Sequence, residues 1–247
     1  MTETSEDPCG NGGAATRTRP RPALDFRVYL VTDRARCGSL GVVGTVRIAV
    51  HHGATVVQLR DPGATDAELV GLGRELVREL EPAGVALLVN DRPHLVAPIG
   101  AAGVHLGQGD LDAATGRARL GPEAVIGLSA QTLDHVESAR SLAGGISCVN
   151  YLGVGPIWST DSKSDAAPPC GTAHLACMVS ASPWPVVAIG GITPERTAEV
   201  RASGAAGIAT ISGICGQSDV GRATRALRTA WDRATAGPGG RRRGSHT

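Results

Sequence analysis

Short apolar stretches alternate with longer amphipathic stretches along most of this chain. Eight of the short stretches are rich in β-branched residues and apolar on both faces, which is typical of parallel strands buried beneath helices. They span 28–32, 55–60, 85–90, 103–106, 125–129, 149–154, 186–189 and 207–211. The pattern therefore predicts eight strands, each followed by a segment able to form a helix.

Capping signals mark three of the helices. Thr65 and Glu68 form a capping box, and the leucines that follow lie along one stripe, so we expect a helix over 65–80. Thr132 opens a second helix over 133–142, and a third begins at the run from Thr193 to Glu195, where Pro194 suits a first helical turn.

Eight strand-then-helix units fit a compact barrel better than a doubly wound sheet. We therefore predict an α/β protein with one (β/α)8 TIM barrel domain over 24–236. The segments 1–23 and 237–247 lack apolar periodicity, and we expect both to be disordered tails.

Composition narrows the choice of partners. Lys plus Arg number 24 and Asp plus Glu 23, so no net field attracts nucleic acid or an anionic membrane. Aromatic residues are only 2% of the chain, too few for a base-stacking surface. The six cysteines show no zinc-ligand spacing, and no apolar run is long enough to cross a membrane. We expect a cytoplasmic protein that acts on small molecules.

In a barrel of this kind the active site lies at the carboxyl ends of the strands, so the residues there are the candidates. Asp91 and Asp110 follow neighbouring strands, and two carboxylates together with substrate oxygens commonly hold Mg²⁺. Spacing alone supports another interpretation equally well: Asp91 caps a helix beginning at Pro93, and Asp110 caps the segment after it.

Other strand ends suggest anion binding. The turns at Gly190 and Gly191 and at 211–213 can present backbone N–H groups to a phosphate. Arg60 and Lys163 follow two different strands and can grip one anion from two sides. A histidine at a strand end usually satisfies a backbone carbonyl, and we expect that of His105.

Taken in order, these strand-end motifs resemble the thiamine-phosphate synthase family. The matching segments are YLVTD at 29–33, QLRD at 58–61, NDR at 90–92, GVHLGQGD at 103–110, IGLS at 126–129, NYLGVGPIW at 150–158, TDSK at 160–163, AIGGI at 188–192 and IS at 211–212. Together they span about 26–231, with one motif at each strand.

The resemblance implies a transferase of thiamine biosynthesis. Such an enzyme joins hydroxymethylpyrimidine diphosphate to thiazole carboxylate phosphate and makes thiamine phosphate. Pyrophosphate leaves the pyrimidine methylene dissociatively, and the thiazole carboxylate leaves as carbon dioxide. Positions matching the pyrimidine-diphosphate contacts are Gln58, Arg60, Asn90, Ser129 and Lys163, of which Arg60, Ser129 and Lys163 are implied to be catalytic. Asp91 and Asp110 match ligands of one Mg²⁺. Positions matching the thiazole-phosphate contacts are Thr160, Asp161, Ser162, Gly191, Ile211 and Ser212.

The chain departs from that family at a few places. Pro62 stands where the family usually has a Lys, Asp161 adds a negative charge, Ser162 replaces a Thr, and Gly213 replaces an Ala. Two alternatives are a thiazole tautomerase of the same fold, which needs no diphosphate site, and a non-catalytic binder of phosphate ligands. The sequence leaves open association into a homo-oligomer.

Overall fold

The computed structural model describes residues 24–142, 148–162 and 167–234. Eight parallel strands pair in chain order, and β8 pairs with β1, so the sheet closes on itself. The strands are β1 (Val28–Val31), β2 (Val56–Leu59), β3 (Ala86–Asn90), β4 (Gly103–Leu106), β5 (Val125–Ser129), β6 (Tyr151–Val154), β7 (Val186–Ile189) and β8 (Gly207–Thr210). The predicted (β/α)8 barrel is confirmed.

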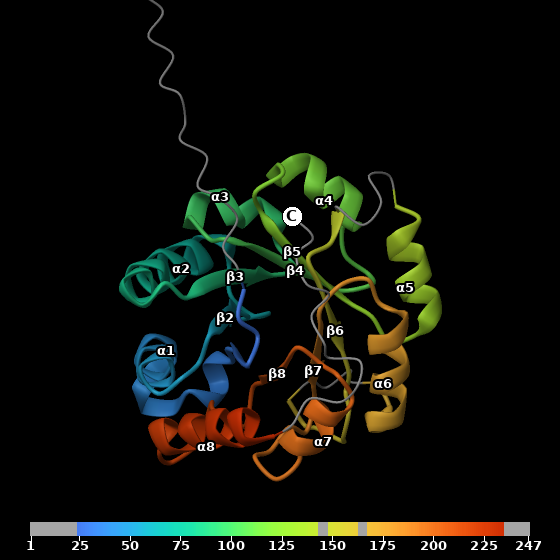
Figure 1. Cartoon of the computed structure of the whole chain (residues 1–247). Coiled ribbons are helices and arrows are strands. Elements are labelled where there is room, and N and C mark those ends of the chain that lie inside the picture. The colour runs from blue at the N-terminus through green and yellow to red at the C-terminus, as the bar shows by residue number, and fades with distance from the viewer. Residues whose placement is uncertain (1–23, 143–147, 163–166, 235–247) are drawn as a thin grey trace, which may run out of the picture.

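A ring of helices surrounds the strands (Figure 1). The α-helices are α1 (Gly41–His51), α2 (Asp66–Leu80), α3 (Val96–Ile99), α4 (Ala113–Leu120), α5 (Leu133–Arg140), α6 (Gly171–Ala181), α7 (Thr197–Ala202) and α8 (Val220–Arg233). Short 3-10 turns η1 (Arg34–Arg36), η2 (Gly38–Leu40), η3 (Glu81–Ala83) and η4 (Pro93–Leu95) complete the described elements. The predicted tails at 1–23 and 237–247 lie outside the described residues.

Most predicted boundaries of strands and helices agree with the structure within two residues. Two helix starts could be predicted because capping hydrogen bonds form within a single helical turn. The Thr65 side chain accepts from Glu68 N, and Glu68 returns the bond, so the capping box of α2 is confirmed. Thr132 caps α5 as predicted, although that helix ends at Arg140 rather than 142.

The third predicted helix start is wrong. Helix α7 begins at Thr197, and its N-cap is Arg196 rather than Thr193. Arg196 N donates to Thr193 O and Thr197 N donates to Pro194 O. These hydrogen bonds join residues three positions apart, as in a 3-10 helix, so the segment before α7 is a tight turn. A proline and an acid favour this turn as well as they favour an α-helical first turn.

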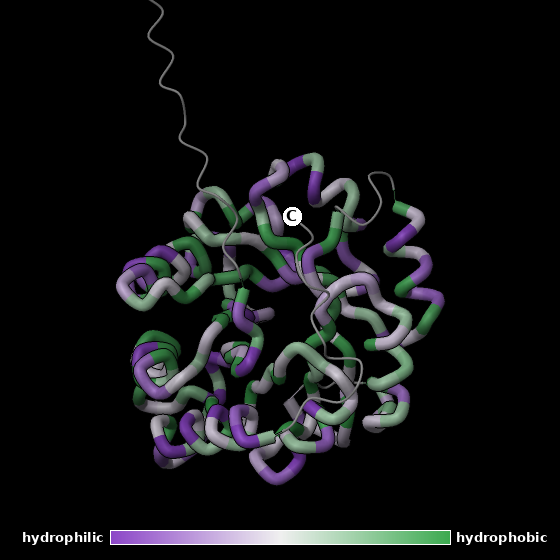
Figure 2. The backbone as a smooth tube through the Cα atoms, in the orientation of Figure 1, coloured by the Kyte–Doolittle hydropathy of each residue, from purple (hydrophilic) through white to green (hydrophobic). Residues whose placement is uncertain are grey.

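Burial explains why the strand pattern is visible in the sequence. In β1, β2 and β8 all four residues are buried, because one face packs into the barrel and the other packs under the helices. Figure 2 shows the hydrophilic segments gathered on the outer helices. Inside the barrel the rings of Phe26 and Tyr151 lie 4.6 Å apart, and a side-chain carbon at Gly127 would overlap the Tyr151 ring.

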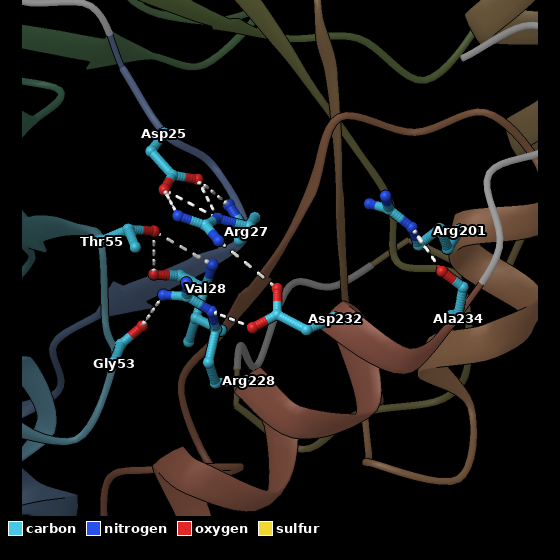
Figure 3. Close-up of polar contacts among 9 residues, drawn as sticks. All are labelled: Asp25, Arg27, Val28, Gly53, Thr55, Arg201, Arg228, Asp232 and Ala234. Atoms are coloured by element: carbon cyan, nitrogen blue, oxygen red, sulfur yellow. Dashed lines mark hydrogen bonds and ion pairs between the residues drawn. The ribbon is translucent and has the colours of Figure 1, made fainter. Parts of the chain in front are cut away.

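Helix α8 is fastened to the entry of β1 by charged side chains (Figure 3). The Arg27 guanidinium donates to the Asp25 carboxylate and lies 3.4 Å from Asp232 Oδ1. Arg228 Nε donates to Asp232 Oδ2 at 2.7 Å, and its Nη1 donates to Gly53 O at 3.4 Å. These contacts join the last helix to the first strand, at the amino-terminal ends of the strands and away from the carboxyl-end loops.

Candidate active site

A cavity opens at the carboxyl ends of the strands, where a barrel of this kind places its chemistry. Its walls include most of the residues that the sequence singled out. From that set the lining contains Gln58, Arg60, Asn90, Asp91, Ser129, Thr160, Ser162, Gly191, Ile211 and Ser212. Residues from six different strand ends therefore face one cavity, although they are far apart in the sequence.

Arg60 directly follows β2, and its guanidinium group forms part of the cavity wall. Its side chain is only 13% exposed, and its Nη1 lies 3.7 Å from Asp33 Oδ2. Its backbone N donates to Thr32 Oγ1 at 3.0 Å, and Thr32 Oγ1 in turn donates to Arg60 O. The guanidinium is thus held in place by a carboxylate and a fixed backbone, and it faces the position where an anionic group can bind.

The two carboxylates predicted as metal ligands have different surroundings. Asp91 lines the cavity with a left-handed backbone, φ 60°, and its carboxylate accepts from Asn90 Nδ2. The Asp110 carboxylate accepts from Gly107 N at 2.6 Å and is not part of the lining. The helix-capping alternative is wrong for Asp91, because the turn after it is capped by Arg92 without a side-chain bond. It is wrong for Asp110 too, since Asp112 caps α4.

These carboxylates suit a hard cation shared with a diphosphate. Strands β3 and β4 are neighbours, and Asn90 is in register with His105, so Asp91 and Asp110 follow adjacent strand ends. Within the residues that the structure describes, no three His, Cys, Asp or Glu side chains form a cluster that could hold a metal alone. Two carboxylates completed by phosphate oxygens and water match the way Mg²⁺ is usually bound beside a diphosphate.

A chain of hydrogen bonds joins residues of different strands that line the cavity, and we call it the polar chain. Gln58 Nε2 donates to Tyr29 Oη at 2.7 Å, and the two phenol oxygens of Tyr29 and Tyr151 lie 2.9 Å apart. His105 Nδ1 lies 2.9 Å from Tyr151 Oη, and His105 Nε2 lies 3.0 Å from Ser129 Oγ. The five members come from five different strands.

The polar chain corrects one expectation and adds two residues. His105 does not satisfy a backbone carbonyl, since its two ring nitrogens lie against the hydroxyls of Tyr151 and Ser129. Tyr29 and Tyr151 both line the cavity, and the sequence motifs gave neither of them a role. The glycine that makes room for Tyr151 is Gly127 of the neighbouring strand, where a side-chain carbon would overlap the Tyr151 ring.

The turn after β7 has the glycine conformations that a phosphate site uses. Gly190 and Gly191 have φ of 97° and 65°. Arg196 holds this turn, because its Nη1 donates to Gly191 O at 2.7 Å and its guanidinium lies over the Trp158 ring. A side-chain carbon at Gly191 would lie 2.7 Å from Trp158 Cβ, so a substitution here disturbs packing as well as any ligand contact.

The loop after β6 is only partly described. Thr160 and Ser162 line the cavity, and Ser162 N donates to Thr160 Oγ1 at 3.3 Å. Asp161 does not line the cavity: its side chain is 84% exposed and pairs with Arg36 at 3.2 Å, which offsets the extra negative charge. Lys163, predicted to contact the diphosphate, lies outside the described residues.

Pro62, the main departure from the family pattern, is exposed in the turn after β2 and is not part of the cavity wall. The adjacent Asp61 pairs with Arg34, whose guanidinium approaches it closely. The region where the family usually has a lysine therefore carries an arginine paired with a carboxylate.

A closed barrel whose cavity at the carboxyl ends of the strands is lined by an arginine and by a glycine turn suited to phosphate is typical of an enzyme that acts on anionic small molecules. Residues 28–214 match the family model described as thiamine monophosphate synthase. A thiamine-phosphate synthase of Azorhizobium caulinodans is 43% identical over 85% of this chain and 96% of its own length. One of Xanthobacter autotrophicus is 42% identical over 85% and 97%.

A solved structure, thiamine phosphate pyrophosphorylase from Pyrococcus furiosus, superposes with a TM-score of 0.75 at 32% identity, covering 84% of this chain and 96% of that one. The chain therefore belongs to the thiamine-phosphate synthase family and is an enzyme, a transferase. The family and activity indicated by the strand-end motifs are confirmed.

Proposed function

We propose that this chain joins a 4-aminopyrimidine methyl diphosphate to a thiazole phosphate, giving thiamine phosphate and pyrophosphate in the cavity at the carboxyl end of the barrel. One observation carries the assignment of the site. Apart from Asp161, the described residues that match the pyrimidine contacts and those that match the thiazole contacts line the same cavity, and they come from six strand ends. A two-substrate condensation requires both ligands to meet in one space.

The reaction requires the site to stabilise pyrophosphate as the leaving group. When pyrophosphate departs from the pyrimidine methylene, the aminopyrimidine ring can carry the positive charge that remains, and the thiazole nitrogen then attacks the carbon. No proton need be removed for the attack, so a general base is not required. The protein must instead neutralise the departing diphosphate and orient the two rings.

Arg60 is suited to neutralise the departing diphosphate. Its guanidinium can donate two parallel hydrogen bonds to phosphate oxygens, and its fixed position lowers the cost of ordering it. We assign Lys163 to the same task. Asp91 and Asp110 would hold one Mg²⁺, which when bound supplies positive charge to the diphosphate oxygens. Asn90 supports this side of the site, because its amide donates to the Asp91 carboxylate.

The other wall suits the thiazole phosphate. Thr160 and Ser162 offer hydroxyls, and Gly191, Ile211 and Ser212 lie on the turns after β7 and β8. Backbone N–H groups in such turns bind phosphate without needing a net charge, which agrees with a chain whose formal net charge is only +1. The Asp161 side chain pairs with Arg36, so Asp161 would contact the thiazole phosphate through its backbone.

The assay is pyrophosphate release by the purified protein given both substrates and Mg²⁺, with each component omitted in turn. We expect release only when all three are present, with thiamine phosphate formed in equal amount. A thiazole tautomerase would change the thiazole without releasing pyrophosphate, and a non-catalytic binder would retain its ligands unchanged. Either of those two results would refute the proposal.

Two expectations from the sequence stay predictions. No helix of the described residues is long and apolar enough to cross a membrane. Cytoplasmic location and association into a homo-oligomer await cell fractionation and a measurement of mass in solution.

A further inference from the structure

Two cysteines that the reaction does not use lie side by side outside the cavity. Cys37 lies between η1 and η2, Cys215 follows β8, and their sulfur atoms are 3.7 Å apart. They are 178 positions apart in the sequence and meet because β8 pairs with β1. Both are free thiols, and they are 5% and 2% exposed. Hydrophobic packing explains a buried cysteine, but it does not require two sulfur atoms to face each other.

The chain segments that carry the two thiols are close to each other. A side-chain carbon at Gly216 would lie 3.2 Å from Arg36 O, so the backbone beside one cysteine approaches the backbone beside the other. A disulfide holds its sulfur atoms at about 2.0 Å, so the two sulfurs must approach by about 1.7 Å to form one. Because both side chains are packed, part of that movement must come from the loops that carry them.

The contact between the sulfur atoms gives the two thiols different reactivity. The hydrogen bond with Cys215 holds the pKa of Cys37 below its ordinary value of 9.0, although burial opposes this shift. The same contact, together with burial, raises the pKa of Cys215. The thiolate is the nucleophilic form of cysteine, so Cys37 is suited to react first and Cys215 to react with the product.

We propose that Cys37 and Cys215 are a site of reversible oxidation by peroxides, and that the disulfide they form weakens the binding of thiazole phosphate. The Cys37 thiolate attacks a peroxide oxygen, the O–O bond breaks, hydroxide leaves, and Cys37 becomes a sulfenic acid. The Cys215 thiol then attacks that sulfur. The S–S bond forms as the S–O bond breaks, and the Cys215 proton leaves with the hydroxyl group as water. The two thiols together lose two electrons, which the peroxide gains.

The effect on the cavity follows from the position of Cys215. Its backbone N donates to Ile211 O at 2.8 Å, and Ile211 and Ser212 line the cavity. Gln217 Nε2 donates to Ser212 O at 2.7 Å, so hydrogen bonds hold 211–217 together as one unit. A pull on Cys215 toward Cys37 therefore displaces the turn to which we assign the thiazole phosphate. This part of the inference rests on the proposed function.

The first measurement maps the disulfide in the full chain without any variant. The protein is treated with hydrogen peroxide, its remaining thiols are alkylated, and it is digested with trypsin without reduction. Cleavage after Arg36 and Arg201 places Cys37 in peptide 37–47 and Cys215 in peptide 202–222, each with a single cysteine. We expect mass spectrometry to find these two peptides linked, with two hydrogen atoms fewer than the separate peptides, and to find them separate again after dithiothreitol.

The second measurement is KM for the thiazole phosphate before and after peroxide. We expect a rise of about tenfold, which corresponds to weakening one hydrogen bond to a charged group, and a return to the starting value with dithiothreitol. Cys37→Ser and Cys215→Ser each remove one sulfur and should keep their KM unchanged by peroxide. Cys177→Ser is the matched control: Cys177 is an exposed thiol in α6, so this variant should respond as the wild type does.

No link between the two peptides, at a peroxide dose that oxidises the exposed Cys177, would overturn the inference. A linked protein with the KM of the reduced protein would overturn it too, and so would a rise in KM that persists in Cys37→Ser or Cys215→Ser. If one serine variant does not fold, the other and the peptide map of the wild type still decide. Failure of the proposed function looks different: the reduced wild type would release no pyrophosphate, whatever the peptide map shows.

Discussion

Gly213 offers a sharp test of the turn after β8, where this chain differs from the alanine usual in its family. Gly213 N donates to Thr210 Oγ1 at 3.0 Å. A side-chain carbon built on Gly213 would lie 2.6 Å from that same oxygen, 3.3 Å from Thr210 Cγ2 and 3.4 Å from Ile192 O. Thr210 is 4% exposed and cannot move away freely. Gly213→Ala should therefore lower the free energy of unfolding by about 1–3 kcal/mol, the usual cost of overpacking.

The turn also carries function, so activity should change with stability. Ser212 precedes Gly213 directly and lines the cavity, and a displaced turn should raise KM for the thiazole phosphate more than KM for the pyrimidine diphosphate. The Thr210→Ala change alone should cost about 1 kcal/mol, because it removes the hydroxyl that Gly213 N contacts. The double variant should be more stable than the sum of the two losses by about 1–2 kcal/mol, since the obstructing hydroxyl is gone.

Urea unfolding followed by tryptophan fluorescence measures all four proteins of this cycle. Gly71→Ala is the control for the substitution itself. Gly71 lies inside α2 with open space around it, so added helix propensity should stabilise that variant by about 0.5–1 kcal/mol. Strictly additive losses at Gly213 and Thr210, or a Gly213→Ala protein as stable as wild type, would show that the contact does not limit this turn.

Four further measurements test the site and the barrel. Asp91→Asn keeps a residue tolerant of the left-handed backbone, and pyrophosphate release at limiting Mg²⁺ should fall by orders of magnitude; an unchanged rate would remove Asp91 from the metal site. Ser212→Ala should weaken thiazole phosphate by about 1.5–3 kcal/mol and leave the pyrimidine diphosphate KM unchanged. Lys163→Ala should raise the pyrimidine diphosphate KM severely, and near-normal kinetics would contradict its assignment. Burial raises the pKa of Asp25, but the hydrogen bonds and charge of Arg27 outweigh it and hold the pKa below its ordinary value of 3.8. The stability that Asp25 contributes is therefore present above that pH and lost as the pH falls below it, so Asp25→Asn should flatten the dependence of the unfolding free energy on pH below about 4.

The strands and the capped helices could be predicted because their causes are local. Four consecutive buried residues identify β1 without any knowledge of its neighbours, and the reciprocal bonds of Thr65 and Glu68 need only one helical turn. The start of α7 could not be predicted in the same way. Thr193 and Pro194 suit both an α-helical turn and a 3-10 turn, and the structure has the 3-10 bonds.

The cavity residues could be placed at strand ends, but their contacts could not be derived from the sequence. His105 is in register with Gly127 of β5, and Gly127 is in register with Tyr151 of β6. Only the closed sheet brings the imidazole to the phenol, across 46 positions of sequence. A rule about strand-end histidines describes an average residue, whereas this one lies between two hydroxyls that the barrel register supplies.

The charges around the cavity mouth explain why we assign Lys163 a large part in binding the diphosphate. Three arginines near this region are paired with carboxylates, whereas Arg196 donates to Gly191 O and lies over the Trp158 ring. The pairs are Arg34 with Asp61, Arg36 with Asp161, and Arg60 with Asp33. Their positive charge is largely offset before any ligand binds, and Arg60 alone among them lines the cavity. A diphosphate brings several negative charges into this wall, so binding it requires further positive charge. The Mg²⁺ that we propose Asp91 and Asp110 hold is one source, and with Pro62 in place of a lysine the ammonium of Lys163, which lies outside the described residues, is the other that the family pattern provides.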